Sequence, residues 1–114
     1  MAYYLYVSIS GEDKICIFEM DADTGVLERQ EDMPLEGGPS GLAIAPNKNF
    51  LYAVRRRINK LATLGVDQAM GTLAHLGTIE EESDSCYVTA DGTGKFVLTS
   101  GQRGARASSY RVGG

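Results

Sequence analysis

The sequence is poor in the residues that build disulfide frameworks and metal centres. It has two cysteines, Cys16 and Cys86, and one histidine, His75, in 114 residues. It contains no Cys-x-x-Cys pair and no cluster of cysteine with histidine, and these are the usual patterns of a zinc site or a disulfide-stapled scaffold. We therefore expect two reduced core cysteines, no metal and no other cofactor.

Positive charge and long apolar runs are also scarce. Basic residues number 11 against 15 acidic ones, a formal net charge of −4, and Arg55-Arg56-Arg57 is the only cationic run. This balance argues against nucleic acid as the main partner. No apolar run approaches the length that spans a bilayer, which argues against a membrane protein. The first residues lack the basic segment of a secretory signal, so we expect a cytoplasmic location.

The sequence does contain an internal repeat. A shift of 46 residues places Leu5-Tyr6 on Leu51-Tyr52 and Gly25 on Gly71, with no gap across that stretch. A second shift of the same size carries Leu51-Tyr52 to Val97-Leu98. A fixed period of roughly 20 to 50 residues is typical of proteins that stack one supersecondary unit repeatedly.

Each copy of the repeat reads as short strands separated by turns. Its segments are rich in β-branched and aromatic residues and are bounded by glycine, proline, asparagine and aspartate. In one period we expect strands at residues 41–45, 50–54, 60–66 and 72–79, preceded by three more at 3–8, 14–20 and 26–32. Gly25 and Gly71 stand where the turns need a residue free to adopt a positive φ.

The repeat predicts an all-β fold of β-propeller blades. The nearly continuous apolar segments 15–18 and 42–45 indicate strands covered on both faces. Four antiparallel strands per period match one propeller blade, and a plain β-sandwich is the alternative. We expect about two and a half blades of a probable seven: three strands of a first, closing blade in 1–39, one complete blade in 40–84 and an incomplete blade in 85–114.

Three segments carry a resemblance to a known family. GPSGLAIAPNKNFLYAV at 38–54, IFEMDADTGVL at 17–27 and CYVTADGTGKFVL at 86–98 resemble the seven-bladed lactonase propellers, which include bacterial 6-phosphogluconolactonases and fungal carboxymuconate cyclases. The resemblance covers essentially the whole chain. Seven blades of this period need about 320 residues. The resemblance therefore implies that the chain is the N-terminal part of such a protein.

The resemblance implies hydrolysis of a sugar lactone by the complete propeller, of the 6-phosphogluconolactonase type found in the pentose phosphate pathway. The isolated chain is then expected to be inactive. The alternative is a truncated, non-catalytic propeller segment that acts as an interaction or assembly module. Open blade edges predict self-association in either case, so we expect the isolated chain to be oligomeric, aggregated or partly unfolded.

Lactone hydrolysis needs a base to activate water and a donor or cation to stabilise the oxyanion. The family places such residues around its central cavity, largely in blades beyond this chain, so the catalytic residues are unknown here. Arg55, which follows the strand at 50–54, is the local candidate for binding a substrate phosphate or carboxylate, because a guanidinium pairs with such groups bidentately. Arg103 is a second candidate on the same rationale. The alternative for both is a solvated arginine in a turn.

The remaining reactive residues have structural interpretations. His75 is expected on the outermost strand of its blade, far from a central channel. Cys86 begins an inner strand but has no nearby histidine to form a thiolate, and buried cysteine is commonly inert. The acidic connector at residues 80–84 is expected to be a solvated surface, with a divalent-cation site as the alternative.

Overall fold

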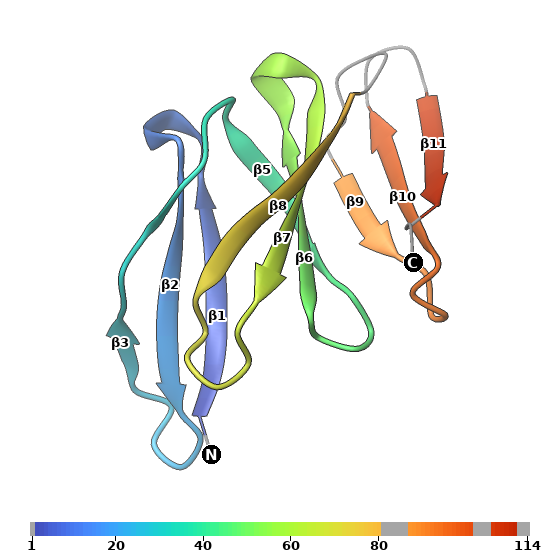
Figure 1. Ribbon diagram of the computed structural model, residues 1–114. Coiled ribbons are helices and arrows are strands. Elements are labelled where there is room, and N and C mark those ends of the chain that lie inside the picture. Colours follow the sequence, from blue (N-terminus) through green and yellow to red (C-terminus); the bar gives the residue numbers. More distant parts are fainter. Residues whose placement is uncertain (1, 81–86, 102–105, 112–114) are drawn as a thin grey trace.

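The computed structural model describes residues 2–80, 87–101 and 106–111, which form three antiparallel β-sheets standing side by side (Figure 1). The first sheet contains β1 (Ala2–Ile9), β2 (Lys14–Asp21), β3 (Leu27–Arg29) and β4 (Met33–Pro34). The second contains β5 (Pro39–Ile44), β6 (Phe50–Arg55), β7 (Lys60–Val66) and β8 (Leu73–Glu80). The third contains β9 (Tyr87–Ala90), β10 (Phe96–Gly101) and β11 (Arg106–Arg111).

Strand order follows the chain in each sheet. The second sheet runs β5-β6-β7-β8 and the third runs β9-β10-β11. In the first sheet β2 lies between β1 on one edge and the short strands β3 and β4 on the other. Because each sheet faces the next along the row, the architecture is that of successive propeller blades, as predicted, and not a sandwich of two sheets.

The predicted strands outside residues 26–32 begin and end within two residues of the observed ones. The strand expected at 26–32 is instead two short strands, β3 and β4, both paired with β2. Pro34 ends the second of them because proline has no N–H to donate to a ladder. Asp32, in the break, turns its carboxylate back to Lys14 and Arg29.

The 46-residue repeat is visible in the turns. A short 3-10 helix, η1 (Ser10–Glu12), joins β1 to β2, and η2 (Arg56–Ile58) joins β6 to β7. Each ends on a left-handed residue, Asp13 with φ 52° and Asn59 with φ 53°, 46 positions apart. Asp and Asn tolerate this conformation better than most residues. Gly25 and Gly71 also have the predicted positive φ, 74° and 76°.

The three sheets pack on one another through two hydrophobic clusters. The one between the first and second sheets consists of Ile15, Leu35, Leu51, Ala53, Ala62 and Leu64, and the one between the second and third of Ala45, Tyr52, Val54, Leu61 and Val97. Neighbouring residues on β6 therefore enter opposite clusters: Leu51 is 1% exposed and Tyr52 2%. The strand β6 is therefore buried on both faces, whereas most of β8 is exposed. Of the two segments predicted to be covered on both faces, residues 15–17 are buried, but in 42–45 only Ala45 is buried and Ile44 is 42% exposed.

Hydrogen bonds from β1 tie the first sheet to the second. The Tyr4 hydroxyl donates to the Ala69 carbonyl (3.0 Å), the Tyr6 hydroxyl donates to the Gly71 carbonyl (2.8 Å), and Ser8 Oγ donates to the Ser40 carbonyl (2.7 Å). Burial raises the pKa of Tyr6, so its hydroxyl keeps the proton that it donates. Gly71 lies so close to Tyr4 that a Cβ at this position would overlap the ring. The β7–β8 turn is thereby shaped to receive both tyrosines.

The helical content of the described residues is limited to the two 3-10 turns. None of it is long and apolar enough to cross a membrane.

Candidate functional site

Polar groups from three connections meet where η1 and η2 lie, at one end of the first two sheets (Figure 1). Asp13 Oδ1 accepts a hydrogen bond from the Gly38 N–H (3.1 Å) and pairs with the Arg57 guanidinium. The Arg57 side chain also donates to the Ser10 carbonyl (3.5 Å), and its backbone N–H donates to the Gly37 carbonyl (2.9 Å). We call these five residues, Ser10, Asp13, Gly37, Gly38 and Arg57, the cross-sheet cluster.

The two glycines of the cross-sheet cluster have a steric reason to be glycine. Gly37 and Gly38 have φ of 92° and 70°, which disfavour other residues. A Cβ on Gly37 would lie 2.6 Å from Ile58 Cδ1, and one on Gly38 would lie 2.7 Å from Arg57 Nε. Sequence reasoning missed this cluster. The available signals were the Gly37-Gly38 pair before a strand and the Asp13–Asn59 match in the repeat.

Arg55, the predicted substrate contact, lies at the end of β6 beside the cross-sheet cluster. Its Nε donates to the Glu36 carbonyl (2.7 Å) and its Nη1 donates to Thr78 Oγ1 (3.4 Å). Thr78 belongs to β8, at the opposite edge of the sheet from β5. The Arg55 guanidinium thus reaches toward the outer strand β8 and holds the segment that leads into β5. A substrate bound by Arg55 would contact a guanidinium that also makes these two hydrogen bonds.

The other predicted residues fall at different places. Arg103 lies outside the described residues; in the 46-residue register it corresponds to Arg57, whereas Arg55 corresponds to Gly101. His75 is exposed on β8, as predicted, with Nε2 3.2 Å from Thr78 Oγ1. Cys86 and residues 81–84 of the acidic connector also lie outside the described residues.

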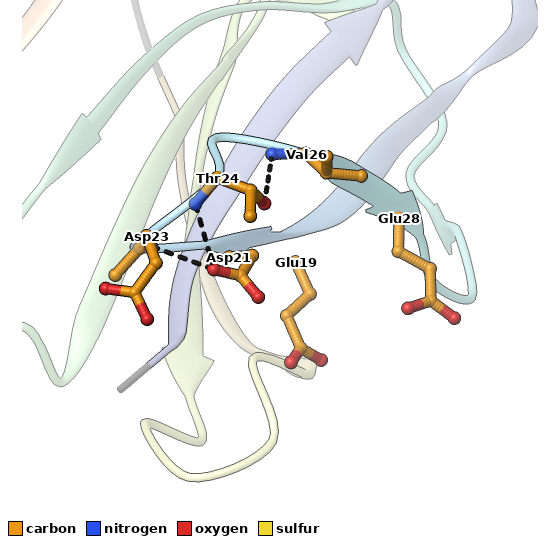
Figure 2. A pocket seen from close by; sticks show the side chains of 7 residues that line it. Glu19, Asp21, Asp23, Thr24, Val26 and Glu28 are labelled. Carbon is orange, nitrogen blue, oxygen red and sulfur yellow. Dashed lines mark hydrogen bonds between the residues drawn. The ribbon is translucent and has the colours of Figure 1, made fainter.

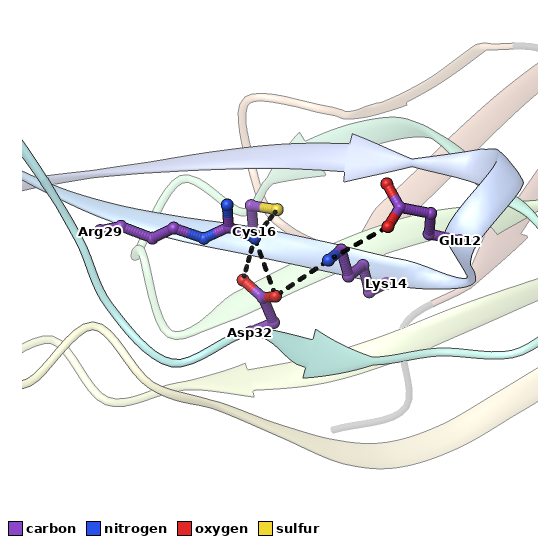
Figure 3. Close-up of polar contacts among 5 residues, drawn as sticks. All are labelled: Glu12, Lys14, Cys16, Arg29 and Asp32. Atoms are coloured by element: carbon purple, nitrogen blue, oxygen red, sulfur yellow. Dashed lines mark hydrogen bonds and ion pairs between the residues drawn. The ribbon is translucent and has the colours of Figure 1, made fainter.

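A second polar group lies on the first sheet and includes the other cysteine (Figure 3). The Asp32 carboxylate lies 3.2 Å from Lys14 Nζ and 3.0 Å from Arg29 Nη2, and Glu12 lies 3.5 Å from the same Lys14 Nζ. Arg29 Nη2 also donates to the buried Cys16 Sγ (3.4 Å). The hydrogen bond from Arg29 lowers the pKa of Asp32, and the one to Asp32 raises the pKa of Lys14. We call Glu12, Lys14, Arg29 and Asp32 the charge cluster.

Cavities also lie away from the cross-sheet cluster, and two of them have polar linings that bear on substrate binding. One, about 580 Å³, surrounds the β2–β3 turn and is lined by four carboxylates, those of Glu19, Asp21, Asp23 and Glu28 (Figure 2). Like charge makes it unsuitable for a phosphorylated or carboxylate substrate. Asp21 Oδ1 accepts from the N–H groups of Asp23 (2.8 Å) and Thr24 (3.1 Å), and these bonds lower the pKa of Asp21. The Asp21 carboxylate therefore stabilises the β2–β3 turn by accepting these two backbone hydrogen bonds.

Another cavity, about 470 Å³, lies between the first and second sheets. It is lined by Tyr3, Tyr4, Tyr6, Ile44, Lys48, Val66 and Gln68. It offers one ammonium group and several aromatic rings, but the hydroxyls of Tyr4 and Tyr6 are already bonded across the sheets. Over the described ranges, no group of three or more His, Cys, Asp or Glu side chains is placed to hold a metal ion.

Comparison with known proteins decides the family. The model of the family "Lactonase, 7-bladed beta-propeller" matches residues 2–78 and, in a second match, residues 36–114. The chain belongs to the seven-bladed lactonase propeller family. This confirms the resemblance carried by the segments at 17–27, 38–54 and 86–98 and agrees with the three sheets described above.

The proteins to which the chain is similar are longer than the chain. It is 30% identical over 103 residues to the 6-phosphogluconolactonase of Blochmanniella pennsylvanica, an alignment that covers 90% of the chain and 30% of that enzyme. A candidate 6-phosphogluconolactonase from Bacteroides uniformis superposes with a TM-score of 0.87 at 22% identity, covering 96% of the chain and 34% of the other. The periplasmic gluconolactonase PpgL of Pseudomonas aeruginosa gives 0.84 at 21%, covering 95% and 32%. The chain spans about a third of the length of these relatives.

Proposed function

We propose that this lactonase-family chain is the N-terminal part of a hydrolase of the 6-phosphogluconolactonase type. The complete propeller would add water to a sugar lactone and release the open-chain acid, acting in the cytoplasm in the pentose phosphate pathway. The observation that carries the proposal is the family match along the whole chain, together with 30% identity to a 6-phosphogluconolactonase.

The sheets support a matching division of the chain. We propose that residues 1–39 are three strands of a closing blade, residues 40–84 a complete blade and residues 85–114 an incomplete one. The support is that β5 to β8 form a sheet of four strands in sequence order, whereas β1 aligns in the repeat with β6, the second strand of that sheet. A further inner strand would pair with the edge of β1 that faces away from β2.

The direct experiment is to read the genomic DNA beyond the codon for Gly114 in all three frames. The proposal predicts further 46-residue blades, in frame or after a single shift. If none follows, the enzyme proposal fails and the chain is better described as a non-catalytic assembly module, our second candidate. Self-association through its open blade edges, which is proposed for both, then becomes its main property.

Arg55 and Arg103 remain proposed substrate-binding residues. The proposal for Arg55 rests on its position beside the cross-sheet cluster and its guanidinium chemistry. Its bonds to Glu36 and Thr78 provide a matched control, because T78V removes one of these bonds and leaves the guanidinium in place. In the complete lactonase we expect R55E to raise KM for the phosphorylated lactone at least about 10-fold, the effect of losing a charge-assisted bond. An unchanged KM, or an equal rise in T78V, would remove Arg55 from substrate binding.

A further inference from the structure

The cross-sheet cluster lies on the connections between strands, at the junction of the first two sheets (Figure 1). Asp13 follows η1 in the first sheet, Arg57 belongs to η2 in the second, and Gly38 directly precedes β5. The contacts of the cluster join these two sheets to each other, and none of them involves an outer face of the row. The arrangement therefore does not depend on what packs on the outer faces.

Two donors of different kinds converge on one carboxylate oxygen in this cluster. Asp13 Oδ1 accepts a hydrogen bond from the backbone N–H of Gly38 (3.1 Å) and meets the Arg57 guanidinium through Nη2. A guanidinium beside a backbone N–H is a donor set suited to phosphate and carboxylate anions. Gly38 brings its N–H this close because it lacks a Cβ, which would lie 2.7 Å from Arg57 Nε. The anion held by these donors is the protein's own Asp13 carboxylate.

The repeat separates the charge of Asp13 from the shape of its turn. Asn59 stands 46 positions later and ends η2 as Asp13 ends η1, with φ of 53° against 52°. A neutral side chain therefore satisfies the same left-handed turn. The turn does not require the negative charge at position 13, and that charge meets the guanidinium of Arg57.

The Asp13 carboxylate is open to exchange with another anion. The side chain of Arg57 is 57% exposed and that of Asp13 41%, so solvent reaches the ion pair. Exposed ion pairs contribute little to stability, because water and salt screen them. Asp13 presents one oxygen to both donors, whereas a phosphate dianion has three acceptor oxygens and pairs with arginine bidentately. These donors therefore bind a phosphate more strongly than they bind the carboxylate.

We propose that the cross-sheet cluster is a phosphate-binding site that the Asp13 carboxylate fills in the free protein. The incoming phosphate displaces Asp13 and accepts hydrogen bonds from Arg57 and from the Gly38 N–H. Arg55 ends β6 at the same end of the sheet and adds positive charge to the approach. Two sources share this chemistry, the phosphate of a phosphorylated lactone and free inorganic phosphate. Assigning it to the lactone rests on the proposed function, whereas the site itself does not.

The site is tested by calorimetric titration of inorganic phosphate into protein expressed from the complete open reading frame that contains residues 1–114. D13G empties the site with a residue that adopts φ 52° readily. It should bind phosphate about 3-fold more tightly than the wild type or better, because an exposed ion pair no longer closes the site. R57Q should weaken binding at least about 10-fold, the effect of losing a charge-assisted bond. E12Q is the matched control: it removes a neighbouring carboxylate that pairs with Lys14, and it should leave the phosphate Kd nearly unchanged.

Kinetics identify the source of the phosphate. For a site that takes the lactone phosphate, R57Q raises KM for 6-phosphogluconolactone but not for unphosphorylated gluconolactone, and inorganic phosphate inhibits competitively. Phosphate that binds without competing assigns the site to free phosphate. Folded wild-type protein that binds phosphate but hydrolyses neither lactone contradicts the proposed function and leaves the site standing.

Three results overturn the phosphate site. They are no phosphate binding by either the wild type or D13G, equal affinity in these two proteins, and binding that survives R57Q. Each would leave Asp13 and Arg57 as a structural ion pair between the sheets. Far-UV circular dichroism checks that every variant is folded. D13N, which keeps an oxygen for the Gly38 N–H but loses the charge, should also tighten phosphate binding and replaces D13G in the comparison if D13G unfolds.

Discussion

The sharpest stability prediction concerns Gly71, in the turn that receives Tyr4 and Tyr6. G71A places a Cβ in a backbone with φ 76° and into overlap with the Tyr4 ring. The left-handed conformation costs a non-glycine residue roughly 1–2 kcal/mol. Displacing the packed ring adds about 1–3 kcal/mol, the usual cost of forcing extra volume into a filled site. We therefore expect G71A to lower the free energy of unfolding by about 2–5 kcal/mol.

The repeat supplies a matched control in Gly25, 46 positions earlier. It has nearly the same backbone, φ 74°, but no atom lies within 4 Å of a Cβ placed there. G25A should therefore show only the backbone cost, about 1–2 kcal/mol. The assay is urea unfolding followed by far-UV circular dichroism, with Y4A and Y4A/G71A added to form a double-mutant cycle. In the Y4A background G71A should cost no more than G25A. Equal costs for G71A and G25A in the wild-type background would refute the proposed contact between the turn and β1.

Two other predictions concern the polar clusters. The pKa of Asp32 is lowered below its ordinary value of 3.8, so its ion pairs add stability above that pH, and this stability is lost as the pH falls through the lower folded pKa. We therefore expect D32N to flatten the fall in the free energy of unfolding between about pH 5 and pH 2, the range in which such carboxylates titrate. An unchanged slope would contradict the assignment of these ion pairs to Asp32. In the cross-sheet cluster, D13N keeps an oxygen acceptor for the Gly38 N–H and should cost no more than about 1 kcal/mol, as for exposed ion pairs. D13A removes this acceptor and places alanine, which is less suited than aspartate to φ 52°, at the end of η1. It should therefore lower the free energy of unfolding, followed in thermal melts, by about 1–2 kcal/mol more than D13N does. Equal losses in D13N and D13A would show that Asp13 acts through its charge alone.

The strands could be predicted because their signal is local and repeated. Each copy carries β-branched segments and turn residues at matching positions, and the positive φ of Gly25 and Gly71 follows from the shape of a tight turn. The break in the strand expected at 26–32 was not foreseen. The carboxylate of Asp32, in the break, turns toward Lys14 and Arg29, and strand propensity does not contain this tertiary contact. Pro34, which ends β4, could have been read from the sequence.

The candidate site was harder to predict because it is built between sheets. Sequence position placed Arg55 correctly at the end of a strand, but its partners, the Glu36 carbonyl and Thr78, are 19 and 23 residues away. Asp13 reaches Gly38 and Arg57 from another sheet, and no periodic pattern encodes these contacts. Fold prediction therefore succeeded from local chemistry, whereas the roles of individual polar side chains needed the three-dimensional arrangement.

The central claim, that this chain is part of a sugar-lactone hydrolase, is tested most directly by the rate of acid release from 6-phosphogluconolactone. The measurement uses protein expressed from the complete open reading frame that contains residues 1–114, at constant pH, against the spontaneous rate in the same buffer. The account predicts acceleration that saturates with lactone concentration. A rate equal to spontaneous hydrolysis, from protein shown to be folded, would contradict it.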